Sequence, residues 1–356
     1  MKRVGNVYSK ICSMENLMLA HKNARKDKLF YKEVVMVDSD PEYYLTQIQE
    51  MLINGTYEVK PEDYSVSVIQ DKGKARELWK LPYFPHRIIQ WAIMLQIEDT
   101  FHQVFTDFTC ASLKDKGIHS AMKLMDRYMK DEAGTQYCLK IDVHHFYPNI
   151  DHIILKGLLR KKFKDPDLLA LLDKIIDSHP PKGIPIGSYL SQYLANFYLA
   201  YFDHWLKEKM GVKYVVRYMD DVVIMHHSKA FLHWLRVKMA EYLERLKLAI
   251  KRNWQVFPTR IRGIDFVGYR FFYGFRLLRK KTCTRFKRLM VQIKNKVLRG
   301  NMINYREWCS INSYKGWLKW CNGWRLAEKY IKPVQKAADN YYFLVIKSKK
   351  RKAAVA

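Results

Sequence analysis

The sequence has little cysteine, and the six cysteines in its 356 residues are scattered. None forms a C-x-x-C pair, which argues against a zinc ribbon, so we expect reduced, mostly buried thiols as in a cytosolic protein. The chain also lacks an apolar run of membrane-spanning length and a signal-peptide core near Met1. Internal repeats and low-complexity linkers are missing as well. We therefore predict a globular, cytoplasmic protein that does not cross a membrane.

Acidic residues are too few to balance the basic ones. The chain has 63 Lys and Arg against 35 Asp and Glu, a net charge of +28. The excess is uneven, because residues 276–356 carry 22 basic and 3 acidic side chains, a net charge of +19. Such a balance favours a polyanionic partner, with nucleic acid the first candidate and a membrane surface the second. The length allows two domains or one large one.

The stretch Tyr214–Met225, YVVRYMDDVVIM, carries two adjacent carboxylates between two apolar runs. Its β-branched residues predict two short strands, with Asp220 and Asp221 at the turn between them. Two neighbouring anions repel each other, and a divalent cation that prefers hard oxygen ligands relieves that repulsion. An ordinary Asp-containing turn is the plainer interpretation. A third carboxylate and a nucleotide pocket elsewhere would decide between the two.

A third carboxylate ends the β-rich run Tyr137–Val143. Asp142 closes this run, and an acid at the end of an apolar strand needs a partner. Phe146 and Tyr147 follow it, and NIDH (149–152) can cap the next helix. The plainer alternatives are a strand-end cap for Asp142 and a core position for Tyr147.

A Pro- and Gly-rich loop at the start of Pro180–Met210 opens onto a helix that begins near Ser188. Glycines in such a loop let a ligand approach the backbone closely. By itself this signal is weak.

The other segments show ordinary helix and strand patterns. A basic hairpin is predicted from Tyr64 to Pro82, with its turn at 71–74 and with Lys74, Arg76 and Lys80 on one face. We expect a strand over 263–272 with a bend at Gly268, and a basic, helical chain after Arg276. The predicted helices are Ser13–Lys28 with Leu17 and Leu19 on its apolar side, Asp40–Gly55, Pro85–Phe101, one that follows a loop within 109–130, one within 229–251, and three within 284–347.

The last of these helices mix aromatic and basic residues. Trp308, Trp317 and Trp324 are interleaved with Lys315, Lys319 and Arg325. That mixture suits a surface that stacks on sugars and neutralises phosphates. A helical bundle with a solvated basic face is the alternative.

Taken in order along the chain, these motifs resemble those of the reverse transcriptases, from about Tyr64 to Asn322. YMDD (218–221) matches the catalytic hairpin of that family, and Asp142 with Phe146 and Tyr147 matches the motif before it. Gly183–Asn196 is similar to the nucleotide-pocket helix. FVGY, with Phe266, Gly268 and Tyr269, looks like the primer grip.

One variation points to a subgroup. Most relatives carry Gln-Gly-x-x-x-Ser-Pro on the pocket helix, whereas this chain has Ile186, Gly187, Ser191 and Gln192 at the matching positions. That form, and SYKGWLKWCN (313–322), resemble the reverse transcriptases of diversity-generating retroelements within the group II intron-like superfamily. Because the chain ends soon after this motif, we expect no maturase extension, endonuclease or RNase H domain. Group II intron-type and defence-associated enzymes remain alternatives, as does a non-catalytic RNA-binding scaffold.

The resemblance implies an α+β, right-hand polymerase with α/β fingers, an antiparallel-sheet palm and an all-helical thumb. It implies four segments: 1–63 as an N-terminal helical extension, 64–275 as fingers and palm, 276–346 as the thumb and 347–356 as a basic tail. The implied reaction is error-prone synthesis of cDNA on a retroelement template RNA. The implied partners are template RNA, the cDNA/RNA duplex, deoxynucleoside triphosphates and a small accessory protein.

The resemblance also implies the roles of particular residues. Two Mg²⁺ ions, roughly 3.5–4 Å apart, would be bridged by Asp142 and Asp220, with Asp221 and the Val143 carbonyl assisting. Tyr147 would exclude ribonucleotides, and Ile186 would loosen selection, with errors at template adenines. The remaining expected contacts are Lys74, Arg76, His145, Phe146, Gly187, Gln192 and Lys251 (or Arg252) to the nucleotide, and Phe266, Gly268, Tyr269, Lys315, Lys319 and Arg325 to primer and template.

Overall fold

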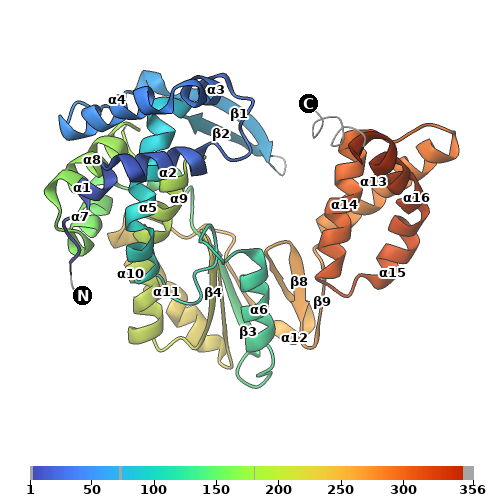
Figure 1. Cartoon of the computed structure of the whole chain (residues 1–356). Coiled ribbons are helices and arrows are strands. Elements are labelled where there is room, and N and C mark those ends of the chain that lie inside the picture. Colours follow the sequence, from blue (N-terminus) through green and yellow to red (C-terminus); the bar gives the residue numbers. More distant parts are fainter. Residues whose placement is uncertain (1–2, 72–73, 180, 348–356) are drawn as a thin grey trace. The chain divides into compact units, whose positions relative to one another are not determined.

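The computed structural model describes residues 3–71, 74–179 and 181–347, and only the backbone of residues 71, 74 and 76 (Figure 1). It is a mixed helix-and-sheet structure with antiparallel pairing, as the sequence predicts. The chain forms two compact units. The first comprises Met1–Ala121, Leu139–Ile224 and Ala230–Val256, and the second comprises Met122–Cys138, Met225–Lys229 and Phe257–Ala356.

The first unit opens with short helices, two of which have side-chain N-caps. Ser13 accepts a hydrogen bond from the Asn16 backbone N–H, and Asp40 accepts one from Tyr43. The buried stripe of α2 follows helical spacing from Leu17 to Ala24, so Leu19 falls off it and is 46% exposed, which corrects the prediction for Leu19. These helices are α1 (Tyr8–Ile11), α2 (Met14–Ala24), α3 (Lys32–Ser39) and α4 (Pro41–Ile53).

A two-stranded antiparallel ribbon follows, as expected. Strands β1 (Ser65–Asp71) and β2 (Lys74–Lys80) pair with Ser65 opposite Lys80 and Ile69 opposite Arg76. Residues 72–73 of the predicted turn (71–74) and the side chains of Lys74 and Arg76 lie outside the described part of the chain.

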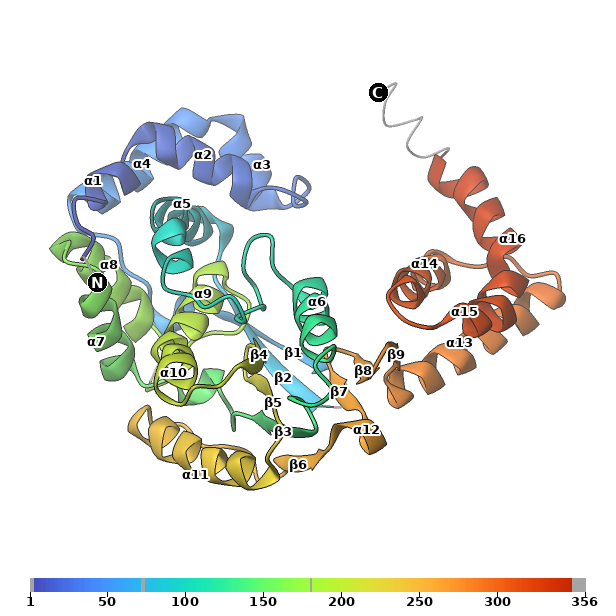
Figure 2. The same cartoon turned by 90° about the horizontal axis from the view of Figure 1, so that it is seen from below.

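The core of the first unit forms around the buried helix α5 (Ile88–His102), which packs against α2 and α9. Phe101 of α5 lies edge-on to Phe197 of α9, with ring centroids 5.1 Å apart. Helices α7 and α8 lie side by side (Figure 2), and Asp151 caps α7 as predicted. The bounds are α6 (Ile118–Tyr128), α7 (His152–Lys162), α8 (Pro166–Asp177), α9 (Tyr189–Tyr198), α10 (Ala200–His204) and α11 (Lys229–Arg245).

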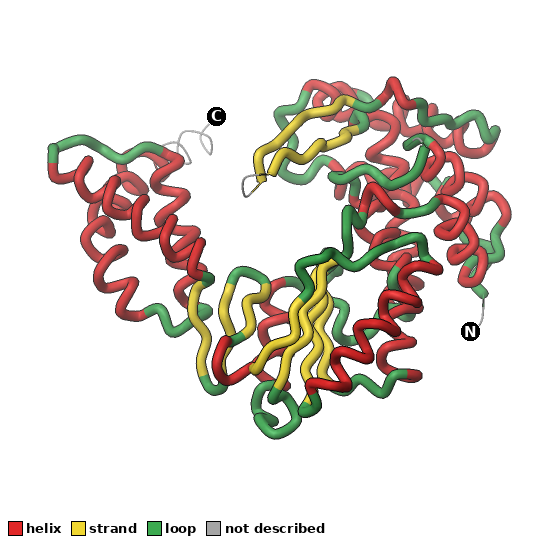
Figure 3. The backbone as a smooth tube through the Cα atoms, turned by 180° about the vertical axis from the view of Figure 1, so that it is seen from behind, coloured by secondary structure: helices red, strands yellow, loops and turns green. Residues whose placement is uncertain are grey.

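A four-stranded sheet with the order β4-β5-β3-β6 positions the candidate site (Figure 3). Strand β3 (Tyr137–Asp142) ends at Asp142, and β4 (Tyr214–Tyr218) and β5 (Asp221–His226) form the predicted hairpin. The edge strand β6 (Gln255–Pro258) was not predicted, because its four residues are too few to show alternation. The sheet therefore brings the end of β3 beside the β4–β5 turn.

In the second unit, the expected bent strand is a hairpin. Val267 and Gly268 have φ angles of 40° and 92°, and consecutive positive φ angles reverse the chain between β7 (Ile264–Phe266) and β8 (Tyr269–Phe272). A third strand, β9 (Phe275–Leu278), pairs with β8. The prediction that the chain is helical directly after Arg276 is therefore wrong.

Helices complete the second unit (Figure 3). The three predicted helical segments are confirmed, with Phe286, Met290 and Ile311 among the buried residues. No helix in the described residues is both long and apolar enough to cross a membrane. None of the six cysteines, all of which lie in the described residues, forms a disulfide bond. Only three of them are buried, fewer than the sequence predicts. The bounds are α12 (Thr259–Arg262), α13 (Lys280–Leu298), α14 (Tyr305–Lys319), α15 (Trp324–Leu326) and α16 (Lys332–Tyr341).

Candidate active site

The backbone ties the end of β3 to the β4–β5 turn. The Val143 N–H donates to the Asp220 carbonyl, with N and O 3.0 Å apart. On the other side, the Lys251 N–H donates to the Asp142 carbonyl over 2.8 Å, and Val143 pairs with Ile250 as an antiparallel bridge. The structure thus brings Asp142, Asp220 and Lys251, which lie far apart in the sequence, to one end of the sheet.

The carboxylates at this end affect one another. Burial raises the pKa of Asp221 to about 6; Lys140 opposes the rise, and Asp142 and Asp220 add to it. The Lys140 ammonium lies 3.5 Å from Oδ2 of Asp221, and the Lys251 ammonium pairs with Asp142. Oδ1 of Asp221 is buried and has no hydrogen-bond partner in the described part of the chain. The positive charge near Asp221 is therefore too small to stabilise its ionised carboxylate fully.

The donor chemistry of this end fits a hard divalent cation, although the side chains do not yet surround one. Among the described residues, no group of three or more His, Cys, Asp or Glu side chains is arranged to hold a metal ion. Lysine ammonium groups pair with two of the carboxylates instead. Three carboxylates with an unsatisfied buried oxygen are the oxygen-rich set that Mg²⁺ prefers. Two lysine side chains would have to move for all three to turn to a cation.

Tyr147 links the end of β3 to the hairpin and to the glycine-rich loop. Its hydroxyl lies 3.8 Å from Sδ of Met219, and its carbonyl accepts from the Ile184 N–H over 3.1 Å. Burial raises the pKa of Tyr147 above its ordinary value, with a smaller contribution from Asp220, so the hydroxyl stays protonated at neutral pH. Gly183 has a φ of 85°, and a Cβ there would lie 2.9 Å from Cα of Pro148. Only glycine permits this close approach.

The start of α9 carries the residues on which the subgroup assignment rests. Oγ of Ser188 accepts from the Ser191 N–H and donates to Gln90 over 2.6 Å, which fixes the helix start. Ile186 and Gln192 are partly buried, and Gly187 is exposed with a φ of 121°. The loop that precedes them is bonded to Tyr147 through the Ile184 N–H.

The other expected nucleotide contacts have mixed placements. His145 has a φ of 42°, and Phe146 is buried. Lys251 is partly buried beside Asp142, whereas Arg252 is exposed. The side chains of Lys74 and Arg76 cannot be placed, because they lie outside the described residues. The geometry thus favours Lys251 over Arg252 as the cation of this site.

The expected primer and template residues all belong to the second unit, so the structure does not place them in this site. The Tyr269 ring stacks on Trp317 with centroids 5.4 Å apart, and its hydroxyl donates to the Trp317 carbonyl. A Cβ on Gly268 would lie 2.5 Å from the Trp317 ring. Phe266 is buried, Lys315 is partly buried, and Lys319 and Arg325 are exposed.

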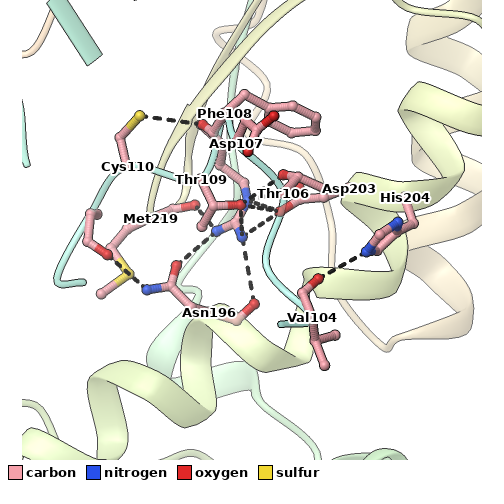
Figure 4. A network of polar contacts seen from close by, with 12 residues as sticks. Val104, Thr106, Asp107, Phe108, Thr109, Cys110, Asn196, Asp203, His204 and Met219 are labelled. Carbon is pink, nitrogen blue, oxygen red and sulfur yellow. Dashed lines mark hydrogen bonds and ion pairs between the residues drawn. The ribbon is translucent and has the colours of Figure 1, made fainter. Parts of the chain in front are cut away.

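A buried polar network behind the hairpin was not predicted from the sequence (Figure 4). Arg217 of β4 and Asp203 of α10 form an ion pair with both side chains fully buried. Thr109 and Asn196 complete the network. A signal was present, because an arginine within the apolar run YVVRY is costly to bury without an acidic partner. Lys140, which points to Asp221, was missed too.

Comparison with known proteins gives one family match. Residues 63–271, more than half of the chain, match the family model described as reverse transcriptase (RNA-dependent DNA polymerase). The match contains Asp142, Asp220 and Asp221, together with the loop and helix of the candidate pocket.

Three curated relatives extend this picture. The chain is 27% identical over 227 residues to the group II intron-encoded protein LtrA of Lactococcus lactis subsp. cremoris, covering 60% of this chain and 37% of LtrA. Protein YkfC of Escherichia coli is 23% identical over 280 residues, covering 66% and 71%. Nuclear intron maturase 4, mitochondrial, of Arabidopsis thaliana is 26% identical over 170 residues, covering 44% and 20%. The match thus spans well under half of LtrA.

Proposed function

The chain belongs to the reverse transcriptase (RNA-dependent DNA polymerase) family, and from that premise we propose that it synthesises DNA on an RNA template. One observation carries the proposal: the Val143–Asp220 backbone bond holds the end of β3 against the Asp220–Asp221 hairpin. This bond brings Asp142 to the adjacent pair Asp220 and Asp221, from which it is far removed in the sequence. The substrates of this reaction would be template RNA, a primer end and deoxynucleoside triphosphates.

The chemistry needs divalent cations, which reverse transcriptase domains generally use. Asp142, Asp220 and Asp221, with the Val143 carbonyl, would hold two Mg²⁺ ions, which when bound activate the primer hydroxyl and stabilise the leaving pyrophosphate. The ammonium of Lys251, now paired with Asp142, would turn to the triphosphate and donate a proton to pyrophosphate. The Tyr147 side chain, with its hydroxyl protonated, would fill the space that a ribose 2′-hydroxyl needs. The His145 and Phe146 backbone would face the triphosphate.

We extend the proposal to the architecture and the subgroup. The ribbon β1–β2 and its neighbours would be fingers, the four-stranded sheet the palm and α13–α16 the thumb of a right hand. The Ile186, Gly187, Ser191, Gln192 pattern favours a diversity-generating retroelement enzyme. In that case the product would be cDNA with errors at the positions that copy template adenines. A small accessory protein would be a partner.

A group II intron-type enzyme is the second candidate. It is favoured by the similarity to LtrA, which is a group II intron-encoded protein. Extension of a DNA primer on a generic RNA template tests the proposed activity, and sequencing of the resulting cDNA tests the proposed subgroup. Errors concentrated at template adenines support the retroelement enzyme, and evenly spread errors support the intron type. No extension under any condition, with duplex binding intact, would instead favour a non-catalytic scaffold.

A further inference from the structure

The guanidinium of Arg217 lies fully buried behind the β4–β5 turn. Its Nε lies 2.8 Å from Oδ1 of Asp203, and its Nη2 lies 2.6 Å from Oδ2. Both side chains are 0% exposed. A buried pair of this kind is seldom needed for stability, because apolar residues of similar size often stabilise a fold as well or better. Its presence calls for a second role.

That role is indicated by the other donors of Arg217. Its Nη1 donates to the Met219 carbonyl over 3.0 Å and to Oδ1 of Asn196 over 3.1 Å. Nη2 makes longer contacts of 3.5 Å to Oγ1 of Thr109 and to the Asn196 carbonyl. All five N–H groups of the guanidinium thus have acceptors, and the planar fork fixes their directions.

The partners of Arg217 are themselves held. Oγ1 of Thr109 donates to Oδ2 of Asp203 over 2.9 Å, and Nδ2 of Asn196 donates to the Ala111 carbonyl over 2.8 Å. The strand-like segment around Thr109 pairs with Arg217 through its backbone. The guanidinium therefore has a fixed position relative to β4.

The group that this fork holds is the residue where the hairpin reverses. Met219 has a φ of 56°, a conformation that side-chain-bearing residues adopt only when their surroundings impose it. Arg217 holds the Met219 carbonyl from behind, and the Val143 N–H holds the next carbonyl, that of Asp220, from β3. These two bonds hold the backbone from which the side chains of Asp220 and Asp221 extend.

We propose that Arg217 is a positioning residue for the candidate active site. With Asp203, Asn196 and Thr109 it locks the Met219 turn in its positive-φ conformation and so aims the carboxylates of Asp220 and Asp221. The role of this network in catalysis rests on the proposed function, whereas the locking of the turn is a property of the unliganded chain. Lysine cannot replace arginine here, because a single ammonium cannot bond Asp203 and the Met219 carbonyl in the same planar fork.

The test uses the full chain in three variants. Arg217→Lys keeps the charge and loses the fork. Arg217→Met with Asp203→Leu removes the ion pair and refills its volume with apolar atoms. The matched control is Asp165→Ala, since the buried Asp165 carboxylate accepts from Val7, Tyr8 and Leu168, none of which belongs to the hairpin.

Three readouts separate positioning from stability. Amide hydrogen exchange of the peptide 214–226, without ligand, reports opening of the turn, and we expect it to rise about tenfold or more in both Arg217 variants but not in the control. In single-nucleotide addition, kcat should fall about 100-fold, as a small misplacement of reacting groups does, while KM for the nucleotide changes far less. Affinity for a primer–template duplex should stay within about twofold, because the network touches no surface.

The double variant decides the case even if Arg217→Lys does not fold. A melting temperature at or above that of the control, with fast exchange in 214–226 and low kcat, supports the proposal. Slow exchange in 214–226 or wild-type kcat in a folded Arg217 variant overturns it. If the wild-type chain extends no primer, the proposed function fails, but the exchange measurement still tests whether Arg217 locks the turn.

Discussion

Two hairpins, each with a positive φ angle in its turn, are held in different ways. The β4–β5 turn has Met219 at a φ of 56°, and the β7–β8 turn has Gly268 at 92°. The first is held by a hydrogen bond from the buried guanidinium of Arg217 to the Met219 carbonyl. The second is held mainly by the Trp317 ring packed against Gly268, whose carbonyl also accepts from the Arg279 N–H over 3.0 Å. Hydrogen bonds from a planar fork fix the direction of a carbonyl, whereas packing of a ring fixes shape.

The difference follows what each hairpin is expected to do. The first hairpin carries Asp220 in its turn and Asp221 at the start of β5, and it must aim both charged groups, so directional bonds suit it. The turn at Gly268, with the partly buried Trp317 packed against it, would offer an aromatic surface to a primer, and shape suffices for that. We call Arg217 the first anchor, because it holds the β4–β5 turn, and Trp317 the second anchor, because it packs on the β7–β8 turn. We infer that damage to the first anchor lowers the rate of reaction and that damage to the second lowers affinity for the duplex.

The largest effect should come from removing a charge at the first turn while its anchor stays in place. In Asp220→Asn we expect nucleotide addition to fall about 1,000-fold or more, because metal ligation contributes several kcal/mol to the transition state. Duplex binding should persist. Asp27→Asn, at an exposed turn, is the control for removal of a carboxylate. Polymerisation by Asp220→Asn within about tenfold of wild type would contradict the assignment of this turn.

The second anchor can be broken at Gly268. In Gly268→Ala the new Cβ meets the Trp317 ring at 2.5 Å, and the residue must also adopt a φ of 92°. Overpacking typically costs about 1–3 kcal/mol, so the melting temperature should fall and duplex affinity should drop by up to about tenfold. Gly274→Ala shares the positive φ, 78°, but has open space around it. Equal losses in the two variants would show that strain, not contact with Trp317, sets the effect.

A third test concerns charge near the second anchor. Exchanging Lys315, Lys319 and Arg325 for Gln should reduce the salt dependence of duplex affinity, with the log–log slope falling by about 0.9 for each phosphate that these side chains no longer neutralise. The same exchange at the exposed residues Lys207, Lys209 and Arg245 of the first unit is the control. An unchanged slope in the first triple variant would remove these side chains from the duplex-binding surface.

The smallest effect should come from Ile186, which we propose lies in the nucleotide pocket. Its apolar side chain cannot hydrogen-bond a correctly placed nucleotide, and one such bond is worth about 0.5–1.5 kcal/mol, or roughly two- to tenfold in selectivity. Ile186→Gln should therefore lower the error rate at template adenines, as read by sequencing the cDNA. Ile186→Leu is the apolar control. Equal adenine errors in all three enzymes would exclude Ile186 as a determinant of fidelity.

The sequence predicts the first hairpin better than the second for a physical reason. Strong β-branched runs flank Asp220 and Asp221, so the strands and their turn are readable. In GIDFVGYRFF the apolar pattern continues through the turn, and a bend and a reversal at Gly268 look alike in one dimension. Strand β9 was missed because its four residues, FRLL, are too few to show alternation and pair only through the tertiary fold.

The anchors themselves are almost invisible in the sequence. Trp317 reads as one of several aromatic residues on a basic helix, and its contact with Gly268 depends on how α14 packs on the β7–β8 turn. Arg217 and Asp203 are ordinary charged residues until the fold buries both of them. The unusual position of Arg217 inside an apolar strand predicts a buried partner but cannot say which acid it is.

The most direct measurement compares the two anchors in one experiment. For Arg217→Lys and Gly268→Ala, kcat for single-nucleotide addition and the Kd of the primer–template duplex are measured on the same RNA template. We expect a crossed result, in which Arg217→Lys lowers kcat about 100-fold with little change in Kd and Gly268→Ala raises Kd with little change in kcat. If both variants change the same constant, the two hairpins do not divide positioning and binding between them, and the account is wrong.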